Sequence, residues 1–92
     1  MIVEVAFVPN VEIYTKVMCV YCWRAKQLLD RKGVEYKEIA VDSGGELRQR
    51  MISRANGRST VPQIFIDDRH IGGCDDLYRL DHAGRLDELI AA

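Results

Sequence analysis

The sequence predicts an α/β fold in which a four-stranded mixed β-sheet is flanked by helices on both faces. Three observations support this: short stretches alternate apolar and polar residues, longer stretches carry apolar residues at helical spacing, and glycine-containing turns separate them. Their order along the chain is β-α-β-α-β-β-α. A helical crossover between the first two strands makes them parallel, and the closing hairpin adds an antiparallel edge.

The first part of the chain contains a strand, a helix and a second strand. Val11–Lys16 alternates apolar and polar residues and is rich in β-forming types. Small or apolar residues recur at helical spacing across Tyr21–Lys32, and Gly33 is a plausible helix stop. Val34–Val41 alternates again and predicts the second strand.

A second helix is predicted over Glu46–Asn56, where the apolar residues share one face and Gly57 follows. The preceding turn offers Asp42 or Ser43 as a helix cap. This segment continues the alternation of strands and helices, which is typical of an α/β domain.

The last part of the chain predicts a hairpin and a closing helix. Pro62–Asp67 is a short apolar strand, and His70–Gly73 returns after a tight turn. Asp75 or Asp76 is suited to cap a final helical segment, which is interrupted near Gly84.

Length and charge limit the classes of function. A chain of 92 residues is one domain, which we place at residues 11–92. Residues 1–10 form either a leader or an extra edge strand that Pro9 would end. The net charge of −1 provides no overall basic field for nucleic acid or an anionic membrane, so neither is expected as a partner. The first ten residues lack a basic region and contain Glu4, and we expect a cytoplasmic protein.

Cys19 and Cys22 lie three residues apart at the start of the first predicted helix. Unpaired N–H groups and the helix dipole stabilise a thiolate there. Cys19, before the helical run, is the predicted nucleophile, and Cys22, in the first turn, the resolving thiol. Lys16 is placed to lower the pKa of Cys19 by its charge.

Two other uses of the cysteine pair are less well supported. An intrachain zinc site would need two further ligands, and only Cys74, His70 and His82 remain, without a second closely spaced pair. A structural disulfide across so short a loop would add little stability. The residues therefore favour redox chemistry, with no metal bound by the chain alone.

Three motifs in order then resemble the glutaredoxin family: "YTKVMCVYC", "TVPQIFI" and "IGGCDDL". The resemblance covers Val11 to Ile90 and is to the small bacterial dithiol type of the thioredoxin fold. It implies a glutathione-dependent thiol–disulfide oxidoreductase that reduces glutathione mixed disulfides through Cys19 and protein disulfides through Cys19 and Cys22. Thioredoxin itself is a poorer match, because the "WCGPC" pattern is missing.

The resemblance also implies a glutathione site. Its residues would be Lys16, Tyr21, Gln49, Thr60, Val61, Pro62, Gly73, Cys74 and Asp75. The backbone of Val61 would pair with the cysteinyl part of glutathione, and Pro62 would be the cis-proline. The backbones of Cys74 and Asp75 would bind the γ-glutamyl carboxylate, while the Asp75 side chain takes the ammonium group.

The remaining roles follow the family more loosely. Lys16 and Gln49, or Arg50 in place of Gln49, would meet the glycyl carboxylate of glutathione. Tyr21 would border the site, and Cys74 would be a non-catalytic thiol. Expected partners are glutathione and proteins that carry glutathione adducts or disulfides.

The segment departs from the family's common "KPTCPYC" pattern at Val17, Met18 and Val20, and Trp23 stands where a basic residue or histidine is common. These changes add apolar area beside Cys19. In the family pattern a proline stands between the two cysteines, where this chain has Val20. Some glutaredoxins without that proline hold a [2Fe–2S] cluster between two protomers, so the alternative function is a cluster-binding dimer that uses Cys19 and glutathione. Without a cluster, a monomer is expected. A redox-silent module that binds an extended peptide beside "TVP" is the other alternative.

Overall fold

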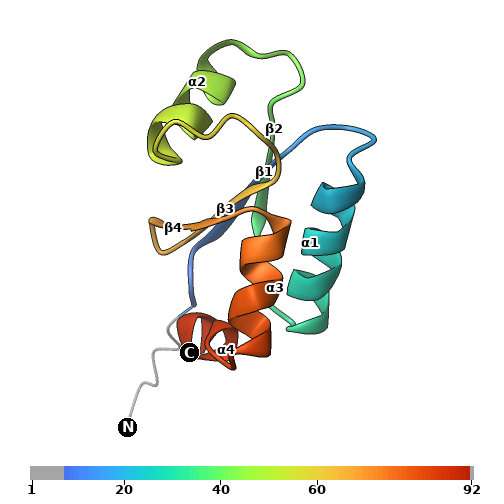
Figure 1. The fold of residues 1–92 in the computed structure, drawn as a ribbon, viewed down its shortest axis with the longest axis vertical. Coiled ribbons are helices and arrows are strands. Elements are labelled where there is room, and N and C mark those ends of the chain that lie inside the picture. The colour runs from blue at the N-terminus through green and yellow to red at the C-terminus, as the bar shows by residue number, and fades with distance from the viewer. Residues whose placement is uncertain (1–7, 92) are drawn as a thin grey trace, which may run out of the picture.

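A computed structural model describes residues 8–91 of the chain. Its elements follow the predicted order, with the last helical segment divided into two helices near Gly84 (Figure 1). The elements are β1 (Val11–Thr15), α1 (Val20–Arg31), β2 (Lys37–Ala40), α2 (Gly45–Arg54), β3 (Gln63–Ile66), β4 (Arg69–Gly72), α3 (Cys74–His82) and α4 (Leu86–Ile90). The choice between leader and edge strand concerns residues 1–10; residues 1–7 lie outside the described residues, and residues 8–10 belong to no strand.

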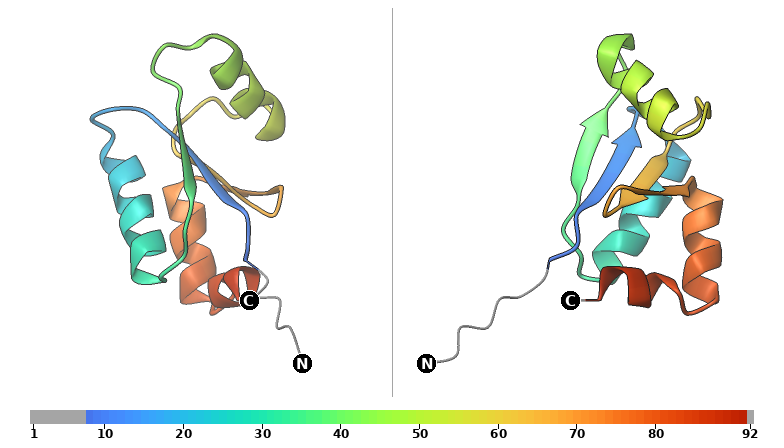
Figure 2. Two further views of the ribbon diagram at one scale, coloured as in Figure 1. Left: turned by 180° about the vertical axis from the view of Figure 1, so that it is seen from behind. Right: turned by 90° about the vertical axis from the view of Figure 1, so that its left-hand side faces the viewer.

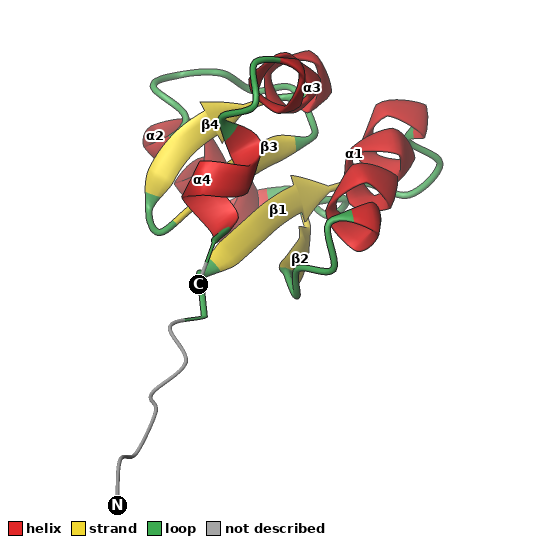
Figure 3. Ribbon diagram, turned by 90° about the horizontal axis from the view of Figure 1, so that it is seen from below, coloured by secondary structure: helices red, strands yellow, loops and turns green. Residues whose placement is uncertain are grey.

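The sheet has the order β2-β1-β3-β4 and mixes both strand directions. β1 pairs with β2 in parallel, from Glu12 opposite Lys37 to Thr15 opposite Ala40. β3 pairs antiparallel with both β1 and β4. Helices α1 and α3 lie on one face of the sheet and α2 on the other (Figures 2 and 3). The chain leaves the central strand β1 and runs directly into the cysteine loop.

The period-two pattern of the central strands distributes their side chains between two cores. On one face, Val11 and Ile13 of β1 join apolar residues of α1, α3 and α4. On the other face, Tyr14 and Phe65 pack with Met51 of α2. Their rings meet edge to face at 5.7 Å between centroids. Both sides of the sheet are therefore covered, as the sequence predicts.

Arg54 fixes α2 to the sheet. Its guanidinium donates to the Tyr14 hydroxyl at 3.0 Å and to Glu12 at 2.9 Å, and lies 4.0 Å from the centroid of the Phe65 ring. The Glu12 carboxylate and the Tyr14 hydroxyl raise the pKa of Arg54, so the group stays charged. This one side chain connects the end of α2 to two strands.

The predicted cap of α2 is wrong. The N-cap is Gly44, with φ of 70°, and no side chain caps the helix. Asp42 instead accepts a hydrogen bond from the Val17 N–H at 2.8 Å. Its carboxylate therefore holds the loop before Cys19, and the helix start falls to a glycine that tolerates positive φ.

Of the two predicted caps of α3, Asp75 and Asp76, only Asp76 takes part in capping, and it does so from inside the helix. Gly73 is the N-cap, and Asp76, three residues later, accepts a hydrogen bond from the Gly73 N–H at 2.9 Å. Asp76 thus supports the helix start from inside the first turn.

Two element boundaries also differ from the prediction. The second strand begins at Lys37 rather than Val34, since only residues from Lys37 on pair with β1, and α2 ends at Arg54 rather than Asn56.

Candidate active site

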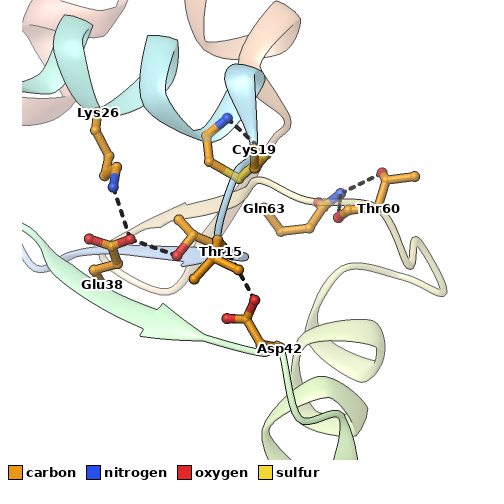
Figure 4. Close-up of a disulfide and its surroundings, with 9 residues drawn as sticks. Thr15, Cys19, Lys26, Glu38, Asp42, Thr60 and Gln63 are labelled. Atoms are coloured by element: carbon orange, nitrogen blue, oxygen red, sulfur yellow. Dashed lines mark hydrogen bonds and ion pairs between the residues drawn. A yellow bond between two sulfur atoms is a disulfide. The ribbon is translucent and has the colours of Figure 1, made fainter.

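The two cysteines occupy the first turn of α1. Cys19 is the N-cap residue, and its sulfur accepts a hydrogen bond from the Cys22 N–H at 3.1 Å. The two side chains form a disulfide (Figure 4). Cys22 is 1% exposed, whereas Cys19 is half buried. A reacting partner can therefore reach Cys19 but not Cys22, which is the order of accessibility that a nucleophile and a resolving thiol require.

The start of α1 is suited to a negative sulfur once the disulfide is reduced. The first N–H groups of a helix have no intrahelical partner, and the dipole places partial positive charge there. The Cys22 N–H already points at the Cys19 sulfur, and the first turn contains no acidic side chain. This geometry favours the thiolate, which is the reactive form in disulfide exchange.

A groove of about 760 Å³ lies along one side of the cysteine pair. We call it the apolar groove. It is lined by Thr15, Lys16, Val17, Met18, Cys19, Val20, Cys22, Trp23, Lys26, Glu38, Ala40 and Asp42. Its walls come from the β1–α1 loop, the first half of α1 and the β2 edge of the sheet.

Polar contacts fix the walls of the apolar groove. Lys26 of α1 is 3.0 Å from Glu38 of β2, and Glu38 also accepts a 2.7 Å hydrogen bond from the Thr15 hydroxyl (Figure 4). That hydroxyl and the Lys26 ammonium lower the pKa of Glu38. Asp42 holds the loop through the Val17 N–H. The groove is thus a formed surface that joins helix, loop and sheet edge.

A second groove, of about 290 Å³, is formed by the loop before β3 and the start of α3. We call it the polar groove. It is lined by Tyr21, Arg58, Thr60, Val61, Pro62, Gly73, Cys74, Asp75 and Asp76. Tyr21, which lies between the two cysteines in sequence, lines this groove, so the groove adjoins the first turn of α1. Seven of the nine predicted glutathione-site residues meet here.

The loop that forms one wall of the polar groove is held by Gln63. This fully buried side chain donates through Nε2 to the Thr60 carbonyl at 2.9 Å and to its hydroxyl at 3.3 Å. Its Oε1 lies 2.7 Å from His70 Nε2, which must therefore be the donor. The Val61–Pro62 peptide bond is cis, and no backbone hydrogen bond between described residues uses the N–H or C=O of Val61.

The opposite wall is the start of α3. Asp76 accepts from the Gly73 N–H and lies 3.1 Å from Arg58 Nη1. The Gly73 hydrogen bond and the Arg58 charge lower the pKa of Asp76. The N–H groups of Cys74 and Asp75, in the first turn, have no intrahelical acceptor and no side-chain acceptor among the described residues. Unpaired N–H groups at a helix N-terminus are suited to an anion.

Arg58, Gln63 and His70 were not predicted from the sequence as site residues. Arg58 joins the loop before β3 to α3, and nothing in the local sequence indicates its partner. For Gln63 a signal existed: it is a polar residue inside the apolar run "PQIFI", and a buried amide requires hydrogen-bond partners.

Cys74 lines the polar groove but is only 5% exposed. Burial raises the pKa of this thiol and outweighs the nearby Arg24 charge, which acts to lower it. A neutral buried thiol is a poor nucleophile. Cys74 therefore contributes its backbone to the groove rather than its sulfur.

Two of the predicted residues lie elsewhere. Lys16 is exposed and lines the apolar groove with Cys19. Gln49 is exposed on α2 and lines neither groove, and the same holds for its neighbour Arg50.

Comparison with known proteins agrees with this geometry. The model of the Glutaredoxin family matches residues 11–71. The chain belongs to the glutaredoxin family. Glutaredoxin 3 of Escherichia coli strain K12 is 60% identical over 81 residues, which are 88% of this chain and 96% of that protein. Family membership and the Cys19–Cys22 disulfide make the chain a thiol–disulfide oxidoreductase.

Solved glutaredoxin structures share the fold. The solution structure of glutaredoxin from Brucella melitensis is 53% identical, with a TM-score of 0.78, and the match covers 90% of this chain and 89% of that one. A crystal structure of a buckwheat glutaredoxin–glutathione complex is 33% identical, with a TM-score of 0.79, and covers 89% of this chain and 76% of that one. The predicted thioredoxin fold is confirmed.

The described residues contain neither a cluster of metal-ligating side chains nor a membrane-spanning helix. No group of three or more His, Cys, Asp or Glu side chains within residues 8–91 could hold a metal ion. In the same part of the chain, no helix has the length and apolar character needed to cross a membrane.

Proposed function

We propose that this glutaredoxin uses glutathione as its reductant and reduces both glutathione mixed disulfides and protein disulfides. The observation that carries the proposal is the polar groove beside Cys19. It offers an unpaired backbone edge at Val61 and a helix N-terminus at Cys74, next to the Asp75 carboxylate. Glutathione, an extended tripeptide with charged ends, presents matching groups.

Within this groove we assign the residues as follows. The N–H and C=O of Val61 pair with the cysteinyl residue of glutathione, in the manner of an added strand. The N–H groups of Cys74 and Asp75 bind the γ-glutamyl carboxylate, and the Asp75 side chain binds the ammonium group. Tyr21, Thr60, Pro62 and Gly73 complete the walls. Lys16 and Gln49, outside the groove, remain the predicted partners of the glycyl carboxylate.

The monothiol reaction needs only Cys19. Its thiolate attacks the glutathione sulfur of a mixed disulfide, and the S–S bond to the substrate breaks. The substrate thiolate leaves and takes a proton from water. A glutathione thiolate then attacks the sulfur of the Cys19-bound glutathione, which releases glutathione disulfide and restores the Cys19 thiolate.

The dithiol reaction uses both cysteines. Cys19 attacks one sulfur of a protein disulfide, and the other substrate sulfur leaves as a thiolate that is then protonated. Cys22, deprotonated on attack, displaces the substrate from Cys19 and closes the disulfide that the structure contains. Two glutathione molecules then reduce this disulfide and leave as glutathione disulfide.

The test supplies glutathione, glutathione reductase and NADPH as the only electron source. The wild type should reduce the mixed disulfide of glutathione and cysteamine, and Cys19→Ser should reduce turnover to the uncatalysed rate. Cys22→Ser should retain the monothiol reaction and lose reduction of a protein disulfide. Turnover by Cys19→Ser, or a wild type that accepts electrons only from thioredoxin reductase, would refute the proposal.

A cluster-binding dimer is the second candidate, favoured by Val20 at the position between the cysteines. Within the described residues one chain lacks a ligand set for a metal. A [2Fe–2S] cluster would therefore need Cys19 from two copies and two glutathione thiolates. After anaerobic reconstitution with glutathione, a dimer fraction with absorbance near ~320 and ~420 nm would support this function; a colourless monomer would exclude it.

A further inference from the structure

Exposed apolar side chains are concentrated around the cysteine pair. Among the described residues seven large apolar side chains are exposed, and five of them fall between Val17 and Trp23. Met18 is fully exposed, and Val17 is 75% exposed. Exposed apolar patches often mark a surface that a partner covers.

Four of these five side chains line the apolar groove: Val17, Met18, Val20 and Trp23. Both cysteines line the same groove, so it is continuous with the atoms that react. The fifth, Tyr21, lines the polar groove instead. The redox pair therefore lies between two surfaces of different chemistry.

The charges of the apolar groove cancel. Lys16 and Lys26 oppose Glu38 and Asp42, and Lys26 and Glu38 form an ion pair. Lys16 can meet the glycyl carboxylate of glutathione, but the γ-glutamyl carboxylate and the ammonium group of glutathione have their assigned partners in the polar groove. An uncharged segment with apolar side chains matches the apolar lining of this groove and its zero net charge.

We propose that the apolar groove binds the protein substrate itself: an extended segment in which apolar, uncharged side chains flank the disulfide cysteine. The proposal rests on the dithiol reaction described above. In that reaction the substrate cysteine becomes bonded to Cys19, so the residues beside it are brought to the groove that Cys19 lines. The polar groove serves glutathione, and the apolar groove selects among proteins.

The intermediate balances without a further reactant. The Cys19 thiolate forms a disulfide with one substrate sulfur, and the second substrate sulfur leaves as a thiol after protonation by water. Cys22 then forms the Cys19–Cys22 disulfide and releases the first substrate sulfur as a thiol. The protein supplies both electrons, so one turnover by the reduced protein needs no glutathione.

The test is therefore a single turnover. Protein reduced beforehand and freed of reductant is mixed with two disulfide peptides that differ only beside the attacked cysteine, with leucine and phenylalanine in one and serine and glycine in the other. We expect the wild type to reduce the apolar peptide about tenfold faster, the effect of burying roughly two methylene groups. Val17→Thr combined with Met18→Gln should lower this ratio to about twofold. Both side chains are exposed, so the fold is not at risk.

Leu47→Gln is the matched control. Leu47 is 46% exposed on α2 and lines neither groove, so its replacement should leave the tenfold ratio unchanged. Reduction of the glutathione–cysteamine disulfide should be equal in all three proteins. An unchanged peptide ratio in the Val17/Met18 variant, or an equal fall with the small disulfide, would overturn the proposal. Because no glutathione is present in the single turnover, failure here is separate from failure of glutathione dependence.

Trp23 provides a second measurement. It is the only tryptophan of the chain, is 57% exposed and lines the apolar groove. In Cys22→Ser, which traps the peptide on Cys19, the apolar peptide should shift the emission to the blue and protect it from acrylamide. Attachment of glutathione at Cys19 should do neither. Equal protection by both adducts would contradict a separate protein-binding groove.

Discussion

The two grooves beside the cysteine pair are built in different ways. The apolar groove is lined mostly by neighbours in sequence, from Thr15 to Lys26, with one edge of β2. The polar groove forms where the loop before β3 lies against the start of α3. Buried or hydrogen-bonded polar groups fix each of these two segments. Substitutions at exposed positions can change the apolar groove without disturbing the fold. The polar groove, in contrast, depends on the correct packing of the whole domain.

Gly72→Ala should damage the polar groove most. Gly72 has φ of 118°, and a Cβ there would collide with the Asp76 carboxylate. We expect a loss of about 3 kcal/mol in the free energy of unfolding, from strain and displacement of Asp76 together. Denaturant titration measures it.

The control for this change is Gly84→Ala. Gly84 also has positive φ, at 72°, but nothing lies within 4 Å of its added Cβ. The loss should be about 1 kcal/mol, the strain alone. Equal losses at the two glycines would show that contact with Asp76 is unimportant.

Asp76→Asn should have the next largest effect. Its carboxylate accepts from the Gly73 N–H and pairs with Arg58, and we expect a loss of about 2 kcal/mol in the free energy of unfolding. Asp75→Asn next to it should change stability by less than about 0.5 kcal/mol. The Asp75→Asn substitution should instead raise KM for the glutathione mixed disulfide and leave kcat unchanged. A large loss of stability in Asp75→Asn together with a raised KM in Asp76→Asn would contradict this division of roles.

Acid should weaken the polar groove through the same carboxylate. The pKa of Asp76 is lower in the folded protein than its ordinary value of 3.8. The group therefore stabilises the fold at pH values above about 4, and this contribution is lost as pH falls through the folded value. Between pH 6 and pH 3 the wild type should lose more unfolding free energy than Asp76→Asn, as two acid titrations followed by denaturant unfolding would show. Parallel losses would contradict the assignment.

Cys74→Ala should have the smallest effect on catalysis. The thiol is buried, so removal of its sulfur should lower the unfolding free energy by about 1 kcal/mol. Turnover of the glutathione mixed disulfide should stay within about twofold, because the groove uses the Cys74 backbone rather than its sulfur. A large fall in turnover at unchanged stability would instead make Cys74 a participant in the redox reaction.

The contrast between the grooves also explains what the sequence could predict. The strands, the helices and the accessible position of Cys19 follow from local patterns, since periodicity and helix starts are local properties. The prediction of Asp42 as a helix cap is wrong, because its carboxylate accepts a hydrogen bond from the Val17 N–H, which lies 25 residues away in the sequence. Arg58 was missed for the same reason, since its partner Asp76 lies in another element.

Much of the polar groove was nevertheless predicted, because family motifs preserve residues that only the fold brings together. Gln49 shows the limit of that approach: no motif fixes its register, and the structure places it outside both grooves. Exposed apolar residues near Cys19 were visible in the sequence as departures from the family pattern. The groove they line became visible only when β2 was placed beside α1.

The central claim is that glutathione bound to Cys19 occupies the polar groove. The most direct measurement compares amide NMR spectra of Cys22→Ser as a free thiol and with one glutathione attached to Cys19, confirmed by mass. The account predicts the largest shifts at Val61, Cys74 and Asp75, and unchanged resonances at Lys26 and Ala40 across the apolar groove. Large shifts at Lys26 and Ala40, with Val61 and Asp75 unmoved, would contradict it.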